Sequence, residues 1–209
     1  DPVRSFFTDY KGEVTKGHID ELIACIQPYN KEVMDMFTKW LIGIPANLFS
    51  KMKNILVPVL YGGTNTGKTQ FFMRLMPEEV SRYATIQNVN DELNKDASAK
   101  MTSNLMVFFD EFKFNKRTDA VNLRAFISNS LYDFRTPYGR KNIKRDRIAS
   151  ACAATNEFNF IDDAENNRRL IPILVESIDH ARYNAIDKAA LLRECYARYV
   201  KGESYLLDK

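Results

Sequence analysis

Residues 60–71 read LYGGTNTGKTQF, the most informative stretch of the chain. From Gly62 the spacing is G-x-x-x-x-G-K-T, the pattern of a phosphate-binding P-loop. Gly62 and Gly67 permit turns that a Cβ atom would block, so that successive backbone N–H groups can point at an anion. In such loops the lysine reaches the β- and γ-phosphates and the next hydroxyl holds Mg²⁺. The predicted nucleotide-binding residues are Gly62, Gly63, Thr64, Asn65, Thr66, Gly67, Lys68 and Thr69, with Thr69 as a metal ligand.

The segments around this loop decide between a P-loop and an ordinary glycine-rich turn. An apolar run at 54–62 is typical of a buried strand, and 68–76 has the apolar spacing of a helix. The alternation continues, with further strands expected at 83–89, 105–110, 148–156 and 168–176 and helices at 90–101, 117–131 and 182–202. Strands that alternate with helices predict an α/β fold, here a central parallel five-stranded sheet flanked by helices, of the P-loop NTPase class.

The first 53 residues have a different pattern, with no strand alternation and helical spacing at 18–30 and 31–43. Pro28 and Pro45 are expected to punctuate these helices. We predict a helical N-terminal lead-in over 1–53 and the ATPase domain over 54–209, and favour this over a separate functional module in the lead-in. The opening sequence DPVRSFF has no signal-peptide layout and resembles a cut inside a longer chain.

Composition limits the remaining possibilities. The chain has 209 residues and a net charge of only +3, so any nucleic-acid contact must be local. Its three cysteines are widely spaced, which argues against a disulfide framework and favours a reducing cytoplasm. His18 and His180 are far apart, and surface or capping roles are expected for them rather than metal binding. No apolar run approaches the ~20 residues of a membrane span, so no membrane partner is expected.

Two carboxylates, Asp110 and Glu111, follow the apolar run LMVFF. A nucleotide binds at the carboxyl ends of the strands in such folds. Asp110 is therefore predicted to hold Mg²⁺ beside Thr69, and Glu111 to polarise the attacking water as general base. The alternative is a strand that simply ends in solvent. The second carboxylate favours hydrolysis over transfer of the phosphoryl group to a small molecule.

Asn156 and the pair Arg168–Arg169 complete the predicted catalytic set. Asn156 follows a buried strand, where its amide would contact the γ-phosphate and the lytic water; a plain turn residue is the alternative. The arginines precede the last strand and are poorly placed for their own nucleotide. They suit a subunit interface, as an arginine finger supplied to a neighbour, with Arg168 preferred over Arg169. A structural salt bridge is the alternative.

The stretch DFRTPYGRKNIKRDRIA, residues 133–149, is rich in arginine and lysine and bends at Pro137 and Gly139. It is predicted to form a basic hairpin that stands off the sheet and binds the phosphates of a nucleic acid. The predicted DNA-binding residues are Tyr138, Arg140, Lys141, Lys144 and Arg145, with Tyr138 stacking on a base. A solvated charged surface is the alternative. The hairpin is joined to both catalytic strands, so hydrolysis could move it.

The order of these motifs resembles the virulence-associated protein E family, whose ATPase region is similar to superfamily 3 helicases of the AAA+ class. The resemblance covers roughly 54–207 and is tightest from 130 to 175, while 1–53 carry little of it. The motifs that carry it are GGTNTGKT, FFDEF, FRTPYGRK and ATNEFNFIDDAENNRRLIPI. Two residues depart from the family pattern: Ala154 replaces a frequent threonine, and Leu170 stands where an aromatic residue is common.

The resemblance implies an ATP-driven DNA helicase module, primase-associated, from a mobile genetic element and assembled as a hexamer-type ring on single-stranded DNA. By matching motif, Asp110 and Glu111 become the Walker B pair, Asn156 sensor 1 and Arg168 the finger. The chain carries no primase signature. A second hypothesis is a nucleotide-gated assembly switch that acts on a protein partner without unwinding DNA. A metabolic kinase is the third, disfavoured by the predicted finger and sensor.

Overall fold

The computed structural model describes residues 1–88, 95–110, 125–135, 141–158 and 168–207. Five strands form its central sheet, all parallel, in the order β3-β4-β7-β2-β8. They are β2 (Val57–Tyr61), β3 (Ala84–Asn88), β4 (Met106–Asp110), β7 (Ser150–Thr155) and β8 (Leu170–Leu174). Numbered along the chain, the strands lie in the order 5-1-4-3-2, so the P-loop strand β2 is interior, between β7 and β8. The predicted five-stranded parallel sheet is confirmed.

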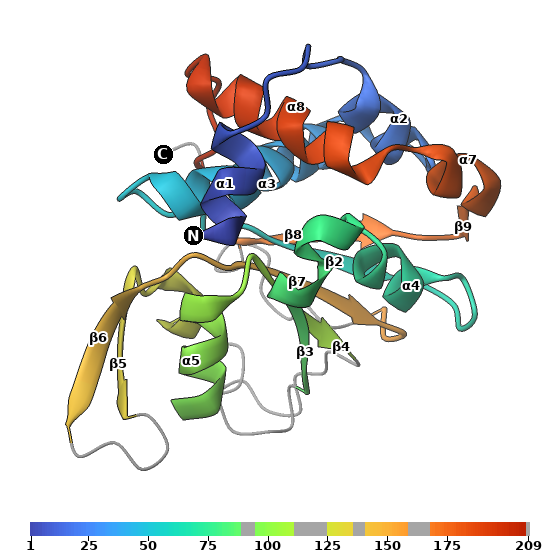
Figure 1. Cartoon of the computed structure of the whole chain (residues 1–209). Helices are drawn as coiled ribbons and strands as arrows, with labels where there is room; N and C mark the ends of the chain where they lie inside the picture. Colours follow the sequence, from blue (N-terminus) through green and yellow to red (C-terminus); the bar gives the residue numbers. More distant parts are fainter. Residues whose placement is uncertain (89–94, 111–124, 136–140, 159–167, 208–209) are drawn as a thin grey trace.

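Helices cover both faces of this sheet (Figure 1). One face carries α3 (Lys31–Phe49), α4 (Lys68–Met73) and α8 (Lys188–Val200), whose apolar residues share a cluster with those of β2, β4, β7 and β8. The other face carries α5 (Lys95–Ser103) and the antiparallel hairpin of β5 (Leu131–Arg135) and β6 (Asn142–Asp146). The remaining elements are α1 (Pro2–Thr8), α2 (His18–Ala24), the 3₁₀ helix η1 (Glu78–Tyr83) and α7 (His180–Ala185), together with β1 (Ile26–Gln27) paired antiparallel to β9 (Ser177–Ile178).

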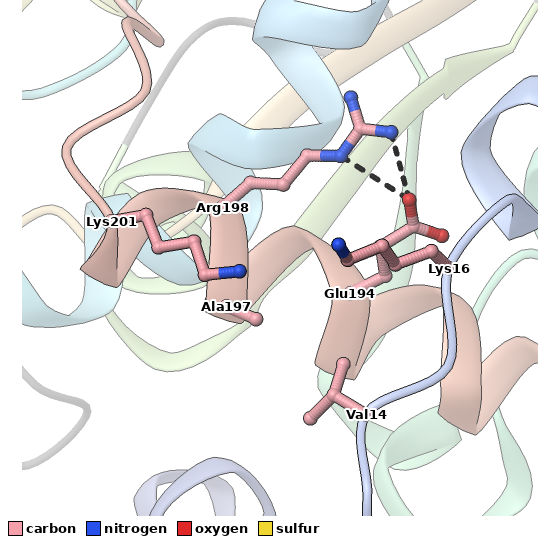
Figure 2. A pocket seen from close by; sticks show the side chains of 6 residues that line it. All are labelled: Val14, Lys16, Glu194, Ala197, Arg198 and Lys201. Carbon is pink, nitrogen blue, oxygen red and sulfur yellow. Dashed lines mark hydrogen bonds and ion pairs between the residues drawn. The ribbon is translucent and has the colours of Figure 1, made fainter.

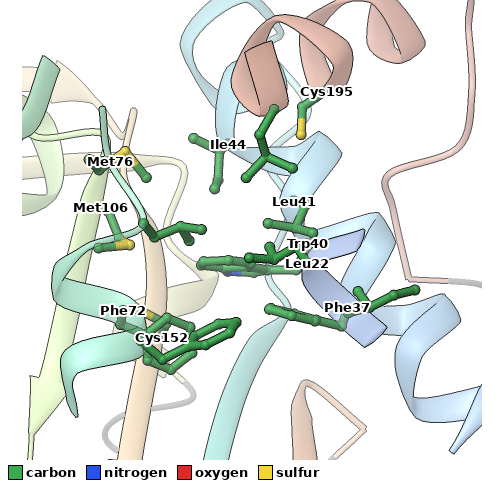
Figure 3. Close-up of a cluster of buried hydrophobic side chains, with 14 of the residues drawn as sticks. Leu22, Phe37, Trp40, Leu41, Ile44, Phe72, Met76, Met106, Cys152 and Cys195 are labelled. Carbon is green, nitrogen blue, oxygen red and sulfur yellow. The ribbon is translucent and has the colours of Figure 1, made fainter. Parts of the chain in front are cut away.

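Aromatic side chains of the N-terminal helices pack into the main core. Trp40 stacks on Phe37 at 5.6 Å between ring centroids and meets Phe72 of α4 edge-on at 5.9 Å (Figure 3). The Trp40 indole N–H also donates to the carbonyl oxygen of Ala151 in β7, at 2.8 Å. Burial of large aromatic side chains is the main stabilising term in such a core. The lead-in therefore shares one hydrophobic cluster with the sheet, while the division of the chain at 53/54 stays a prediction.

Several helical predictions need correction. The helix expected at 18–30 ends at Ala24 and is followed by the short strand β1, and Leu131, expected at the end of a helix, begins β5. Pro45 does not end a helix: it lies inside α3, which continues to Phe49. The lost backbone hydrogen bond is offset because the turns around Pro45 are fully buried against the sheet. The single helix predicted at 182–202 is two helices, α7 and α8. It breaks before Asp187, whose carboxylate accepts the N–H groups of Ala189 and Ala190 and caps α8.

No helix within the described ranges is long and apolar enough to cross a membrane. Cys25, Cys152 and Cys195 are all buried free thiols, and burial raises the pKa of each.

Candidate functional site

The predicted P-loop, residues 62–69, leaves β2 at a point where no side chain fits. Gly62 has φ of 142°, and a Cβ atom there would lie 2.4 Å from the carbonyl oxygen of Val175. Val175, which directly follows β8, is held close to Gly62 because its N–H donates to Tyr61 O at 2.8 Å. Glycine is thus required at 62 by both conformation and space.

The second loop glycine is enclosed by a residue from the C-terminal region. Gly67 has φ of 85°, and a Cβ atom there would fall 2.3 Å from the imidazole of His180, the first residue of α7. The sequence suggested only surface or capping roles for His180. Its contact with the P-loop depends on the path of the chain after β8, which no local pattern reveals.

The Lys68 side chain folds back into the loop. Its ammonium group donates to Gly62 O at 3.0 Å, to Gly63 O, and to Thr66 Oγ1 at 3.1 Å. The side chain is buried, and this desolvation lowers its pKa. Of the other predicted loop residues, Thr64 and Asn65 are exposed, and Asn65 has a left-handed φ of 62°. The lysine therefore shares the loop interior with backbone oxygens, where a phosphate oxygen would offer it a stronger, charged partner.

Thr69 and Asp110 come together at the carboxyl edge of the sheet. The Thr69 hydroxyl lies 3.1 Å from Asp110 Oδ1, where β4 ends. Both face a cavity of about 110 Å³ whose lining is Lys68, Thr69, Asp110, Ala154, Thr155 and Asn156. Within the described ranges, no cluster of three or more His, Cys, Asp or Glu side chains offers a closed metal site. One carboxylate beside one hydroxyl fits Mg²⁺, which binds few protein oxygens and completes its octahedron with water and substrate phosphates.

Asn156 follows β7 directly and lines the same cavity. It reaches the pocket because β7 lies between β4 and β2, so that the ends of three strands meet there. The structure thus brings Lys68, Thr69, Asp110 and Asn156 together. Glu111, the predicted general base, lies outside the described residues.

Arg168 and Arg169 lie at the opposite edge of the sheet, where the parallel strands begin (the amino edge). They precede β8, and the Val57 N–H donates to Arg169 O at 2.8 Å, which fixes them beside the start of β2. The cavity lies beyond the other end of that strand, about 15 Å away at ~3.3 Å per residue. Arg168 is exposed and Arg169 half-buried. The structure therefore does not bring either arginine to the cavity of its own chain.

The predicted basic hairpin is formed by β5 and β6, which project from the same amino edge (Figure 1). Lys141, Lys144 and Arg145 are exposed on it, while Tyr132 and Phe134 anchor it to the sheet. Tyr138 and Arg140 lie outside the described residues. Arg147, from the same basic stretch, is different: it is only 1% exposed and lies beneath the hairpin rather than on its surface.

A second, smaller cavity of about 70 Å³ lies between α8 and the N-terminal segment (Figure 2). The buried Glu194 lines this cavity. The Glu194 carboxylate is bonded to Arg198 at 2.8 Å and accepts hydrogen bonds from the backbone N–H groups of His18 and Ile19. These bonds join α8 to the start of α2, so the role of Glu194 is structural.

The family model of the virulence-associated protein E-like domain matches residues 11–209. This match includes most of the N-terminal helices, for which the sequence showed little resemblance to the family. No curated protein matches the chain.

Solved structures of the NrS-1 C-terminal region share the fold. The apo structure of its residues 305–718 gives a TM-score of 0.67 at 15% identity, covering 93% of this chain and 50% of the other. The A form apo structure gives a TM-score of 0.65 at 16% identity, with coverages of 89% and 47%. The present chain therefore spans about half the length of these structures. The predicted α/β fold with a central parallel five-stranded sheet flanked by helices is confirmed, and so is the resemblance to the virulence-associated protein E family.

Proposed function

The chain belongs to the family of virulence-associated protein E-like domains, and from this premise we propose that it is an oligomeric, Mg²⁺-dependent ATPase that translocates on DNA and unwinds it. The process would be replication of a mobile genetic element, in a reducing cytoplasm. The main support for this proposal is the cavity at the carboxyl edge of the sheet. Its lining includes an ammonium group, a hydroxyl, a carboxylate and an amide, which come from Lys68, Thr69, Asp110 and Asn156.

Each group in this cavity suits one part of a nucleoside triphosphate. Lys68 would exchange its carbonyl partners for the β- and γ-phosphates, and Thr69 and Asp110 would hold Mg²⁺, which neutralises phosphate charge when bound. Asn156 would orient the γ-phosphate and the attacking water by hydrogen bonds. Glu111 would take the proton of that water as general base.

The position of the arginine pair supports an oligomer. Because Arg168 lies about 15 Å from its own cavity, it can serve hydrolysis only at the cavity of another subunit. A guanidinium supplied in trans to a γ-phosphate suits head-to-tail contacts that repeat from one subunit to the next, and such contacts form a ring where the rotation between subunits closes.

The hairpin supports DNA as the partner. Lys141, Lys144 and Arg145 are exposed on an element that stands away from the nucleotide cavity, so they are free to meet phosphates of a single strand. Tyr138 and Arg140, near its tip in sequence, would add a stacking face and a further cation.

The test is an ATPase assay with and without single-stranded DNA, run across protein concentration, with Lys68→Ala as the inactive control. Turnover per subunit should rise as subunits assemble, and DNA should raise it further. Assembly with ATP but no response to DNA would instead support the nucleotide-gated switch. Full turnover by a monomer would contradict the shared active site.

A further inference from the structure

One short link joins the hairpin to the nucleotide cavity. After β6 ends at Asp146, residues 147–149 lead directly into β7, and β7 ends beside Asn156. The hairpin and α4 lie on opposite sides of the molecule (Figure 1). β7 thus has the hairpin root at its amino end and the cavity at its carboxyl end, and the conformation of 147–149 sets how the two are oriented.

Arg147 fixes that link from inside the protein. Its guanidinium donates from Nη1 to Ile127 O and from Nη2 to Asn54 O, each at 2.5 Å, while its backbone N–H donates to Ser130 O at 2.8 Å. No described carboxylate forms an ion pair with it. Burial lowers the pKa of Arg147 to about 10, so the group is still charged at neutral pH. A buried charge held by two carbonyls on separate segments is costly, but it defines one geometry closely.

Two buried asparagines extend this contact to the N-terminal helices. Asn47 of α3 donates to Ser150 Oγ at 3.0 Å and accepts the N–H of Asn54 at 2.7 Å. Asn54 in turn receives Arg147 on its carbonyl oxygen. The hairpin root, the start of β7 and the approach to β2 are therefore parts of one polar network inside the protein.

We propose that Arg147 is a positioning residue that couples DNA binding at the hairpin to ATP hydrolysis in the cavity. Because the guanidinium spans Ile127 and Asn54, a shift of the hairpin on DNA is passed to β7, and so to Asn156, instead of being absorbed by a flexible joint. The inference rests on the proposed function. The inference goes beyond the proposed function because it assigns a role to a residue that would touch neither nucleotide nor DNA.

The experiment compares DNA-stimulated with basal ATPase activity in the wild type, Arg147→Met and Arg147→Lys. Arg147→Met should keep the basal rate and the KM for ATP, while the stimulation ratio falls by about fivefold or more, the lower range of coupling between sites. Arg147→Lys should fall between the two, because one ammonium group cannot span both carbonyls as well as the planar fork does. The matched control is Arg198→Met, which removes a guanidinium from α8 and should lower Tm without changing the ratio.

A wild-type ratio in Arg147→Met would overturn the inference, as would basal and stimulated rates that fall together with Tm. If Arg147→Met does not fold, hydrogen exchange on the wild-type protein decides: DNA should change exchange at 147–149 and at Asn156, and a change confined to the hairpin would count against coupling. A wild type without DNA stimulation would overturn the proposed function and this inference with it.

Discussion

Lys68 at the carboxyl edge of the central sheet and Arg147 at its amino edge are held by different kinds of contact. At the carboxyl edge, the hydrogen bonds of Lys68 run to residues no more than six positions away. At the amino edge, Arg147 bonds to a residue 93 positions away and Asn47 to one 103 positions away. The position of the Lys68 side chain in the predicted P-loop is therefore set within one short segment, whereas the hairpin joint exists only once the chain has folded.

The two edges also differ in how completely their polar groups are covered. The carboxyl edge leaves Asp110 half-buried and Asn156 exposed, and both line a cavity. Arg147, Asn47 and Asn54 at the amino edge are all at most 2% exposed. Substitutions of the cavity residues at the carboxyl edge should thus remove activity and spare stability, while substitutions of the three buried residues at the amino edge should cost stability.

The largest expected effect is a loss of ATP hydrolysis on substitution of Arg168. This residue lies at the amino edge of its own sheet and would act on the nucleotide cavity of the neighbouring subunit. Arg168→Ala should still bind ATP, but its hydrolysis rate should fall by about 10³–10⁵-fold, the usual contribution of an arginine finger. Mixing it with Glu111→Gln subunits should restore some turnover, because a mixed interface joins an intact arginine to an intact carboxylate. Arg169→Ala is the matched control and should lose less. Mixtures without recovery would count against action in trans.

The next effect tests the carboxyl edge alone. Lys68→Ala should weaken ATP binding and slow hydrolysis by on the order of 10²–10³-fold, the range for losing one preorganised charge partner. Its Tm should stay close to that of the wild type, since the substitution also removes a desolvated ammonium group. Nucleotide titration and thermal melting of the same samples measure both quantities. The control is Lys100→Ala, which removes a lysine of α5 that donates to Ile86 O in β3. It should leave nucleotide binding intact. A large drop in Tm for Lys68→Ala would break the contrast between the edges.

The sequence predicts the carboxyl edge well because its signals are local. The glycines at 62 and 67, the apolar strands and the polar residues that end them each report their own surroundings, and parallel pairing then brings Asp110 and Asn156 to Thr69. The sequence also predicts the basic hairpin, since a run of basic residues with a bend at Pro137 and Gly139 is a short-range pattern.

What the sequence does not predict depends on tertiary packing. Arg147 resembles its basic neighbours until the fold surrounds it with the carbonyl oxygens of Ile127 and Asn54. Pro45 looks like a helix end, but burial overrides that preference. The approach of His180 to Gly67 depends on the path taken after β8. Only the break between α7 and α8 had a usable local signal, the N-capping Asp187.

A smaller effect concerns the exposed side of the amino edge. The double variant Lys141→Ala/Lys144→Ala should keep its basal ATPase rate and lose DNA stimulation. Its affinity for single-stranded DNA should depend less on salt, with the slope of log K against log[salt] reduced by roughly 1.4, or ~0.7 per lost phosphate contact. Fluorescence titrations at several salt concentrations measure this slope. An unchanged slope would assign DNA binding to another surface.

The smallest effect concerns the buried side of the same edge. Asn47→Ala removes the amide between α3 and β7 and leaves Ser150 Oγ and the Asn54 N–H without this partner. The free energy of unfolding should fall by about 1–3 kcal/mol, the cost of leaving buried polar groups unsatisfied. Asn142→Ala, on the exposed strand β6, should stay within ~0.5 kcal/mol of the wild type. Urea denaturation measures both values. Equal losses would mean that the asparagine network adds no more to the hairpin joint than a surface residue does, and the contrast between the edges would then rest on Arg147 alone.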